Sequence, residues 1–228
     1  MKAFIFDMDG VIFDSERLYI DCSVEAGEML GMGSVLEACR RCIGVTDEVT
    51  RGILLEIYQD EELVERFRDL SIALVRERVA AGLLDMKPGV RELLDFLQAG
   101  GCRIALASST RTDIVEKELA DAGLREYFCT VVGGDRVSRS KPNPDIFLKA
   151  AEFLGEKPDN CVVIEDSFNG IRAAKAAGMT AVMVPDQLEP DEEMRNLADI
   201  ILPSLTDVKE WLEQKRTDEK EISKTQAM

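Results

Sequence analysis

Residues 3–11 of this 228-residue chain read Ala-Phe-Ile-Phe-Asp-Met-Asp-Gly-Val. Four apolar residues followed by Asp7 predict a short buried strand that ends in two carboxylates, those of Asp7 and Asp9. Similar apolar runs predict further strands at 103–107, 129–132, 161–164, 180–184 and 200–202. Helical patterns lie between these runs, at 90–99, 112–122, 144–154, 170–177 and 205–212. This alternation predicts an α/β fold, with a parallel sheet covered by helices on both faces.

Residues 15–84 interrupt the alternation of strands and helices. They contain helical patterns at 18–30, 49–58 and 63–79, few candidate strands and no proline. We therefore expect an all-helical insert between the first strand and the rest of the sheet. The predicted organisation is an α/β core made of residues 1–14 and 85–214, a helical domain at 15–84, and a polar tail at 215–228 that is expected to be disordered.

The composition excludes several kinds of chemistry. The chain has 28 Lys and Arg residues against 44 Asp and Glu residues and no histidine, so its formal net charge is 28 − 44 = −16. Without histidine there is no Ser-His-Asp or Cys-His nucleophile and no histidine metal ligand. The acidic charge argues against nucleic acid and anionic membranes as partners.

The sequence also suggests a location. An acidic residue follows within seven positions of the N-terminus, so we expect no signal peptide, and no run of about 18 apolar residues predicts a membrane-spanning helix. We expect a cytoplasmic protein. The six cysteines include a Cys39-Arg-Arg-Cys42 pair without a second pair, which we interpret as reduced thiols, with a redox or metal role as the alternative.

Polar residues follow several of the predicted strands, and the carboxyl ends of parallel strands are where such sheets bind ligands. These residues are Asp7-Met8-Asp9-Gly10, Ser108-Ser109-Thr110, Gly133-Gly134-Asp135 and Glu165-Asp166-Ser167, with Lys141 in the loop 138–143. Acids without histidine or cysteine favour a hard cation, and Mg²⁺ is the usual one beside phosphate. Thr110 by itself is expected only to start the helix that follows.

The segment Phe6-Asp7-Met8-Asp9-Gly10-Val11 resembles the first signature, DxDGx(T/V), of the haloacid dehalogenase-like hydrolases. Three further signatures match in the expected order: Ser108 after an apolar strand, Lys141 within Ser-Lys-Pro-Asn-Pro, and Glu165-Asp166-Ser167. The similarity extends over residues 2–212 and is closest to the branch that holds β-phosphoglucomutase and many sugar-phosphate phosphatases. It implies a Rossmann-like core with a helical cap that closes through hinges near 13–16 and 83–88.

The resemblance also implies roles for individual residues. Asp7 would attack phosphorus and form an aspartyl-phosphate, and Asp9 would act as acid and then base. Mg²⁺ would be held by the Asp7 carboxylate, the Asp9 backbone carbonyl and Asp166, with Glu165 orienting bound water. The phosphoryl group would be held by Lys141, the Ser108 hydroxyl and backbone N–H groups around Met8 and Ser109.

Residues that differ between this chain and related enzymes favour some of the family's reactions over others. Asp9 argues against dehalogenation, and the absence of lysine from residues 15–84 removes a Schiff-base phosphonoacetaldehyde hydrolase. The mutase's cap histidine and arginine correspond here to Tyr19 and Asp47, which favours a phosphatase. A mutase, a non-catalytic phospho-ligand module and a receiver-like signalling domain remain as alternatives.

The cap residues give an expectation about the substrate. In related enzymes the first cap helix and a Gly-Val loop face the site, so Glu16, Tyr19, Thr46 and Asp47 are candidate substrate contacts. An acidic, hydroxyl-bearing rim suits a sugar or polyol phosphate. We expect a small phosphorylated metabolite as substrate and a monomeric protein.

Overall fold

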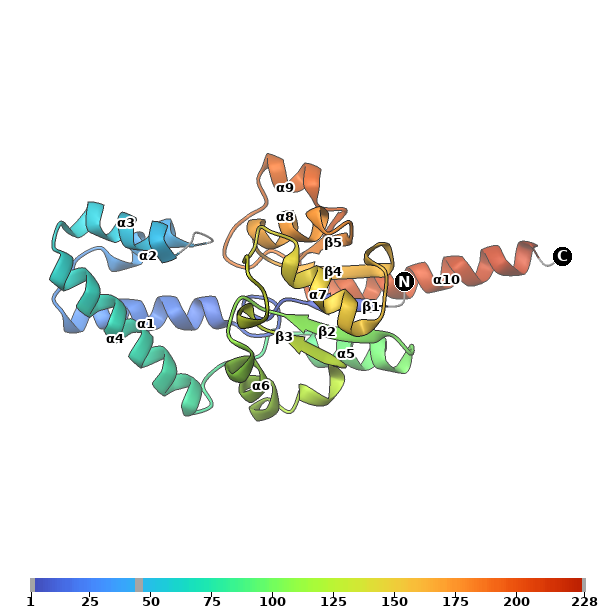
Figure 1. Cartoon of the computed structure of the whole chain (residues 1–228), viewed down its shortest axis with the longest axis horizontal. Coiled ribbons are helices and arrows are strands. Elements are labelled where there is room, and N and C mark those ends of the chain that lie inside the picture. Colours follow the sequence, from blue (N-terminus) through green and yellow to red (C-terminus); the bar gives the residue numbers. More distant parts are fainter. Residues whose placement is uncertain (1–2, 44–46, 227–228) are drawn as a thin grey trace. The chain divides into compact units, whose positions relative to one another are not determined.

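The computed structural model describes residues 3–43 and 47–226 (Figure 1). The chain divides into two compact units. The sheet unit comprises the chain up to Ile12, Lys87–Asp186 and the chain from Pro190 onward, and the helical unit comprises Phe13–Met86 and Gln187–Glu189. The boundaries expected from the sequence, 14/15 and 84/85, are two residues from 12/13 and 86/87, and residues 187–189, which the sequence assigns to the core, group with the helical unit.

Within the described residues, six parallel strands form one sheet in the order β3-β2-β1-β4-β5-β6. The strands are β1 Ala3–Phe6, β2 Arg103–Ala107, β3 Thr130–Val132, β4 Cys161–Glu165, β5 Thr180–Met183 and β6 Ile200–Ile201. Phe6 pairs with Leu106 on β2 and with Ile164 on β4, so these three central strands end at the same level. The α/β fold predicted from the sequence is confirmed.

The central position of β1 places its carboxyl end where the strand order reverses, because the chain continues to β2 and β3 on one side and then crosses to β4 on the other. In open α/β sheets a ligand binds at such a switch point. The topology therefore directs attention to Asp7, the residue directly after β1.

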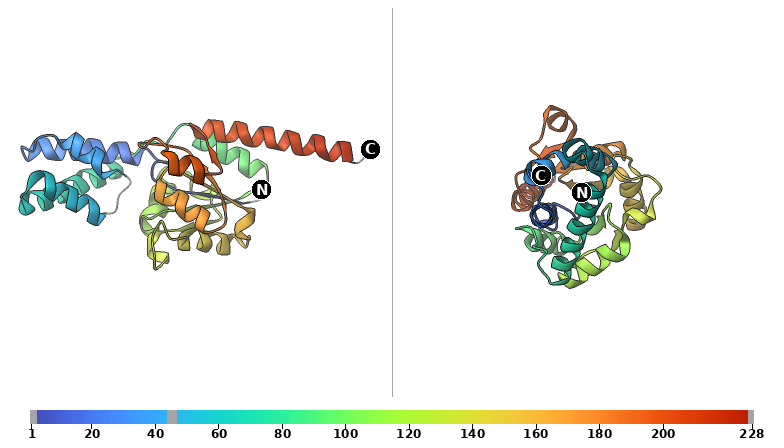
Figure 2. Two further views of the ribbon diagram at one scale, coloured as in Figure 1. Left: turned by 90° about the horizontal axis from the view of Figure 1, so that it is seen from above. Right: turned by 90° about the vertical axis from the view of Figure 1, so that its left-hand side faces the viewer.

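Helices cover both faces of the sheet (Figure 2). Alternate residues of a strand point to opposite faces. Ala3 and Ile5 of β1 pack in one buried cluster with residues of α7 (Asp145–Leu154) and α8 (Phe168–Ala176). The remaining helices of this unit are α5 Val90–Ala99, α6 Thr112–Asp121, α9 Glu192–Leu197 and α10 Leu205–Gln226.

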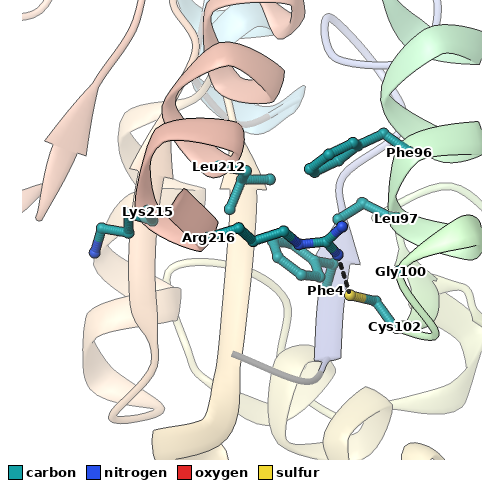
Figure 3. A pocket seen from close by; sticks show the side chains of 8 residues that line it. All are labelled: Phe4, Phe96, Leu97, Gly100, Cys102, Leu212, Lys215 and Arg216. Carbon is teal, nitrogen blue, oxygen red and sulfur yellow. Dashed lines mark hydrogen bonds between the residues drawn. The ribbon is translucent and has the colours of Figure 1, made fainter. Parts of the chain in front are cut away.

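On the other face, Phe4 lines a pocket between α5 and α10 (Figure 3). The Arg216 guanidinium reaches from α10 across this pocket, 4.2 Å from the centre of the Phe96 ring on α5, and donates a hydrogen bond to Cys102 Sγ at 3.6 Å. Leu212 is buried beside it. These contacts hold the middle of α10 against α5.

The expectation of a disordered tail from residue 215 is wrong for the described residues, because α10 continues to Gln226. The segment is polar, but Lys, Glu and Gln are good helix formers. Packing of Leu212 and Arg216 on α5, together with the Lys209–Glu213 ion pair one helical turn apart at 3.0 Å, supports the helix as far as its middle. A pattern of apolar residues alone does not reveal this support.

The described part of the helical unit is built from α1 Ser15–Met29, α2 Val35–Cys42, α3 Asp47–Tyr58 and α4 Glu61–Ala80. The side chains of Leu54, Val64 and Phe67 form its core, with Ala26 and Val35 packed against them. The helix α2 is not expected from the sequence, because it is short and its second half carries the charged pair Arg40-Arg41 between Cys39 and Cys42. All six cysteines lie among the described residues and are free.

Two short connections enter and leave the helical unit. The Asp14 N–H donates to the Asp85 carbonyl at 2.9 Å, and Phe13 and Met86 form an antiparallel bridge. In the sheet unit, the Lys87 N–H donates to the Ile12 carbonyl at 2.9 Å. The outgoing and returning chains therefore run side by side. In the described ranges, no helix combines the length and the apolar character that crossing a bilayer requires.

Candidate active site

The residues after β1 turn sharply away from the sheet. The Asp7 N–H continues the strand ladder by donating to the Ile164 carbonyl at 2.9 Å, and its side chain is buried. Gly10 has a φ of +74°, a conformation that side chains disfavour. A Cβ there would lie 2.4 Å from Asp166 Oδ2, so glycine permits the close approach of Asp166.

Lys141 joins two of the acids. Its Nζ donates to Glu165 Oε1 at 2.7 Å and also to Asp7 Oδ1, and it lies 5.0 Å from the centre of the Phe147 ring. The lysine side chain is 8% exposed, so these bonds are shielded from water. A cation of this kind can hold an anionic group next to Asp7.

Glu165 is fixed at both of its oxygens. While Oε1 accepts from Lys141, Oε2 accepts the Ser167 N–H at 2.5 Å. A Cβ at Gly170 would lie 1.7 Å from Glu165 Oε1, so this glycine makes room for the carboxylate. The sequence predicts Glu165 just beyond its strand, but it is the last residue of β4 and fully buried. Its position there directs it between Lys141 and the start of α8.

Asp7, Glu165 and Asp166 bring one carboxylate oxygen each to within 4.8 Å of one another. Burial raises the pKa of Asp7 to about 8, because the attraction of Lys141 only partly offsets desolvation and the nearby charge of Glu165. Burial and the charges of Glu165 and Asp7 also raise the pKa of Asp166 well above its usual range. Burial disfavours the charge on Lys141, but Asp7 and Glu165 outweigh it and raise its pKa.

The close approach of these three carboxylates bears on whether the site fits a metal ion. Two buried acids and the half-buried Asp166 lie close together, and the one lysine beside them pairs with Asp7 and Glu165, so the site holds an excess of negative charge that a divalent cation would offset. The donors are carboxylate oxygens, which suit Mg²⁺ rather than a soft metal. The residues therefore fit the magnesium ion that the sequence leads us to expect.

A second group of side chains surrounds Asp9. Ser108, fully buried after β2, donates from its hydroxyl to Asp9 Oδ2 at 3.4 Å and accepts the Thr110 N–H at 3.0 Å. The Thr110 hydroxyl donates to the same Asp9 oxygen at 3.2 Å. Sequence reasoning treated Thr110 as a helix-start residue and missed this contact. The available signal was a second hydroxyl two positions after Ser108.

The loop after β3 supports the loop that carries these hydroxyls. Asp135 Oδ1 accepts the Thr112 N–H at 2.6 Å and the Thr112 hydroxyl at 2.7 Å, while the Gly134 N–H donates to the Thr110 carbonyl at 2.9 Å. A Cβ on Gly133 would lie 2.3 Å from the Thr112 nitrogen. The two glycines therefore allow direct backbone packing between the loops.

The other residues predicted for the site are distributed as follows. Met8 is buried directly after Asp7, and Ser109 lies in the loop between Ser108 and Thr110. Glu16 and Tyr19 lie on α1 of the helical unit. Thr46 lies outside the described residues, and Asp47 begins α3. A role for these last four residues in substrate contact stays a prediction.

Comparison with known proteins agrees with this geometry. The family model of the haloacid dehalogenase-like hydrolases matches residues 1–178, which include Asp7, Asp9, Ser108, Lys141 and Asp166. This chain belongs to that family. The fold and the resemblance expected from the sequence are both confirmed, and the protein is a phosphoric monoester hydrolase.

Two curated relatives and one solved structure illustrate the similarity. A phosphorylated carbohydrates phosphatase from Thermotoga maritima is 37% identical over 182 residues, covering 80% of this chain and 84% of that protein. Hexitol phosphatase B from Escherichia coli is 33% identical over 221 residues, covering 90% and 93%. A solved Thermotoga maritima structure assigned as a β-phosphoglucomutase has a TM-score of 0.78 and 33% identity, covering 94% and 99%.

Proposed function

We propose that the chain is a Mg²⁺-dependent phosphatase that hydrolyses a small sugar or polyol phosphate through an aspartyl-phosphate on Asp7. The observation that carries this proposal is the position of the Asp7 carboxylate at the switch point of the sheet, bonded to Lys141 and within 4.8 Å of Glu165 and Asp166 oxygens. A buried carboxylate between a cation and a metal-binding group of acids suits nucleophilic attack on an anionic ester.

The reaction divides into two displacements. In the first, an Asp7 oxygen forms a bond to phosphorus as the bond to the ester oxygen breaks, and Asp9 donates a proton to the leaving alcohol. In the second, Asp9 takes a proton from water as the water oxygen attacks phosphorus, which releases inorganic phosphate and restores Asp7. Lys141 and the Ser108 hydroxyl hold the phosphoryl oxygens in both steps.

The ligands proposed for Mg²⁺ are the carboxylates of Asp7 and Asp166 and the backbone carbonyl of Asp9. When bound, the ion supplies positive charge that reduces repulsion between the nucleophile and the anionic substrate. Both Glu165 oxygens accept hydrogen bonds from Lys141 and Ser167, which supports an orienting role for Glu165 rather than direct ligation.

The substrate class rests on the relatives and on the helical unit. Two relatives are named as phosphatases of phosphorylated carbohydrates and of hexitols. We propose that the helical unit serves as a cap that excludes water and contacts the alcohol portion of the substrate. Glu16 and Tyr19 on α1 offer an acid and a hydroxyl for such contacts.

The decisive experiment measures phosphate release with and without Mg²⁺ from hexitol phosphates, hexose phosphates, glycerol phosphate and nucleoside monophosphates. We expect Mg²⁺-dependent release, fastest from the sugar or polyol esters, and an acid-stable phosphoprotein in rapidly quenched wild-type protein. Asp7→Asn should remove both signals.

A preference for nucleotides would contradict the substrate class, and isomerised sugar phosphate without phosphate release would indicate a mutase. Full activity of Asp7→Asn would contradict the nucleophile assignment.

A further inference from the structure

The Asp9 carboxyl group receives two hydroxyl donors at one oxygen. Ser108 Oγ donates to Asp9 Oδ2 at 3.4 Å, and Thr110 Oγ1 donates to the same atom at 3.2 Å. These two hydrogen bonds hold the Oδ2 side of the carboxyl group and so fix the direction in which Oδ1 faces.

Of the two donors, Ser108 already has a phosphate-binding role in the proposed reaction, whereas Thr110 has none. The Thr110 backbone is held on both sides, since its N–H donates to Ser108 Oγ at 3.0 Å and its carbonyl accepts the Gly134 N–H at 2.9 Å. A Cβ on Gly134 would lie 2.3 Å from the Ser109 carbonyl oxygen, so this contact requires glycine. Because the backbone is held at these points, the Thr110 hydroxyl faces Asp9.

Threonine suits this task better than serine for a physical reason. Its branched Cβ restricts rotation about χ1, so less side-chain entropy is lost when the hydroxyl is held in one direction. The Asp135 carboxylate, by accepting both the N–H and the hydroxyl of Thr112, holds the following residue of the loop in place as well. The whole arrangement lies within the sheet unit.

We propose that Thr110 is the positioning residue for Asp9. Its hydroxyl holds Oδ2 so that Oδ1 faces the leaving alcohol oxygen in the first displacement and the attacking water in the second. This inference rests on the proposed function, because it assigns a helper to the acid and base of that reaction. The hydroxyl bond is compatible with both forms of Asp9, because it occupies only Oδ2.

The test compares leaving groups that do and do not need an acid. Thr110→Val removes the hydroxyl at nearly constant volume, and Thr110→Ser keeps it. Glycerol phosphate needs a proton on its leaving oxygen, whereas p-nitrophenyl phosphate does not. For Thr110→Val we expect kcat on glycerol phosphate to fall about 10- to 100-fold with KM within about 2-fold of wild type, because general acid and base catalysis contributes about 100-fold or more.

With p-nitrophenyl phosphate, Thr110→Val should release one nitrophenolate per protein molecule rapidly and then turn over slowly, because only the second displacement still needs Asp9. Thr110→Ser should restore most of the activity toward glycerol phosphate. Thr180→Val, the same substitution at the amino end of β5, is the matched control and should behave as wild type. Thermal unfolding of all three variants checks folding independently of activity.

Equal losses on both substrates without the initial burst would overturn the assignment, as would a loss confined to KM, which would make Thr110 a substrate contact. Asp9→Asn is measured in parallel. If Asp9→Asn shows the dependence on leaving group and Thr110→Val does not, the role of Thr110 is wrong and the proposed function stands. If Asp9→Asn shows no such dependence, the acid and base assignment of the proposed function fails, and the role of Thr110 fails with it.

Discussion

Lys141 balances the charge of the active site. Its side chain and those of Asp7 and Glu165 are each at most 8% exposed, so the lysine compensates two carboxylates that water scarcely reaches. Removing one member of such a buried set leaves the others without compensation, which costs more than the pair contributes when it is intact. Lys141 is therefore needed for stability as well as for binding phosphate.

Lys141→Met should abolish phosphatase activity and lower the free energy of unfolding by about 3 kcal/mol at about pH 8. Loss of the cation raises the pKa of Asp7 further above its unfolded value. A group whose pKa is raised on folding favours the folded state below its unfolded pKa and loses that contribution as the pH rises. Wild type and variant lose this contribution equally up to about pH 8, so the deficit should be constant from about pH 5 to about pH 8 and grow above about pH 8, where only the wild-type Asp7 ionises beside Lys141, as followed by urea unfolding.

Lys117→Met is the control for this prediction, because Lys117 pairs with Asp121 on the exposed face of α6. Its stability should stay close to that of wild type at all pH values, because exposed ion pairs contribute little. A Lys141→Met protein whose deficit is independent of pH would show that lost packing, rather than uncompensated charge, causes the effect.

In the absence of metal, the Asp166 side chain lowers the stability of the folded protein, whereas Lys141 raises it. Because burial raises its pKa well above the usual range, its ionised form opposes folding at neutral pH. Asp166→Asn should therefore raise the melting temperature in EDTA and remove the increase that Mg²⁺ causes in the wild type. Thermal unfolding with and without Mg²⁺ measures both effects, with the exposed substitution Asp121→Asn as control. A normal Mg²⁺ response in Asp166→Asn would remove Asp166 from the ligand set.

At the scale of elements, the loops after β2 and β3 determine whether the hydroxyls reach the site. Ser108 and Thr110 belong to the first loop, and Gly133, Gly134 and Asp135 belong to the second. The second loop bonds to the backbone of the first at Thr110 and Thr112. Because the two loops are bonded to each other, a small displacement of Gly133 is expected to move the hydroxyls that contact Asp9.

Gly133→Ala tests this coupling. Its φ of −89° suits any residue, so the effect is steric, from a Cβ placed 2.3 Å from the backbone nitrogen of Thr112. We expect a loss of about 1–3 kcal/mol in unfolding free energy and a lower kcat. The control is Gly52→Ala in α3, where nothing lies within 4 Å of the added Cβ; it should stabilise by about 0.5–1 kcal/mol. An unchanged kcat in Gly133→Ala would show that the loop after β3 does not affect catalysis through the loop after β2.

Elements whose apolar residues face the core were predictable. Strands β1 and β2 begin and end where the sequence predicts, because each is an apolar run bounded by polar residues. By contrast, α2 and the second half of α10 were not predicted. The helix α2 has only eight residues, so its apolar positions Val35, Ala38 and Cys39 form too short a pattern to predict it. The second half of α10 is polar, and contacts such as Arg216 on Phe96 join residues far apart in the sequence.

At the scale of the whole molecule, the charge of −16 leaves the protein with mutual repulsion among its acids. Raising NaCl from about 20 mM to about 500 mM in EDTA should increase the melting temperature, because salt screens this repulsion over about one Debye length. The same measurement without EDTA but with Mg²⁺ separates screening from specific binding. A melting temperature that falls with NaCl would show that attractive ion pairs dominate instead.

The sequence by itself determined the reacting groups and their order along the chain. A buried strand ending in Asp7, the absence of histidine, and the successive signatures at Ser108, Lys141 and Glu165 define the family and the chemistry, since each depends on local patterns and residue types. The tertiary structure decided which groups meet. The hydrogen bonds of Lys141 to Asp7 and Glu165, and of Thr110 to Asp9, link side chains 24 to 134 positions apart, and strand register and loop packing bring them within bonding distance.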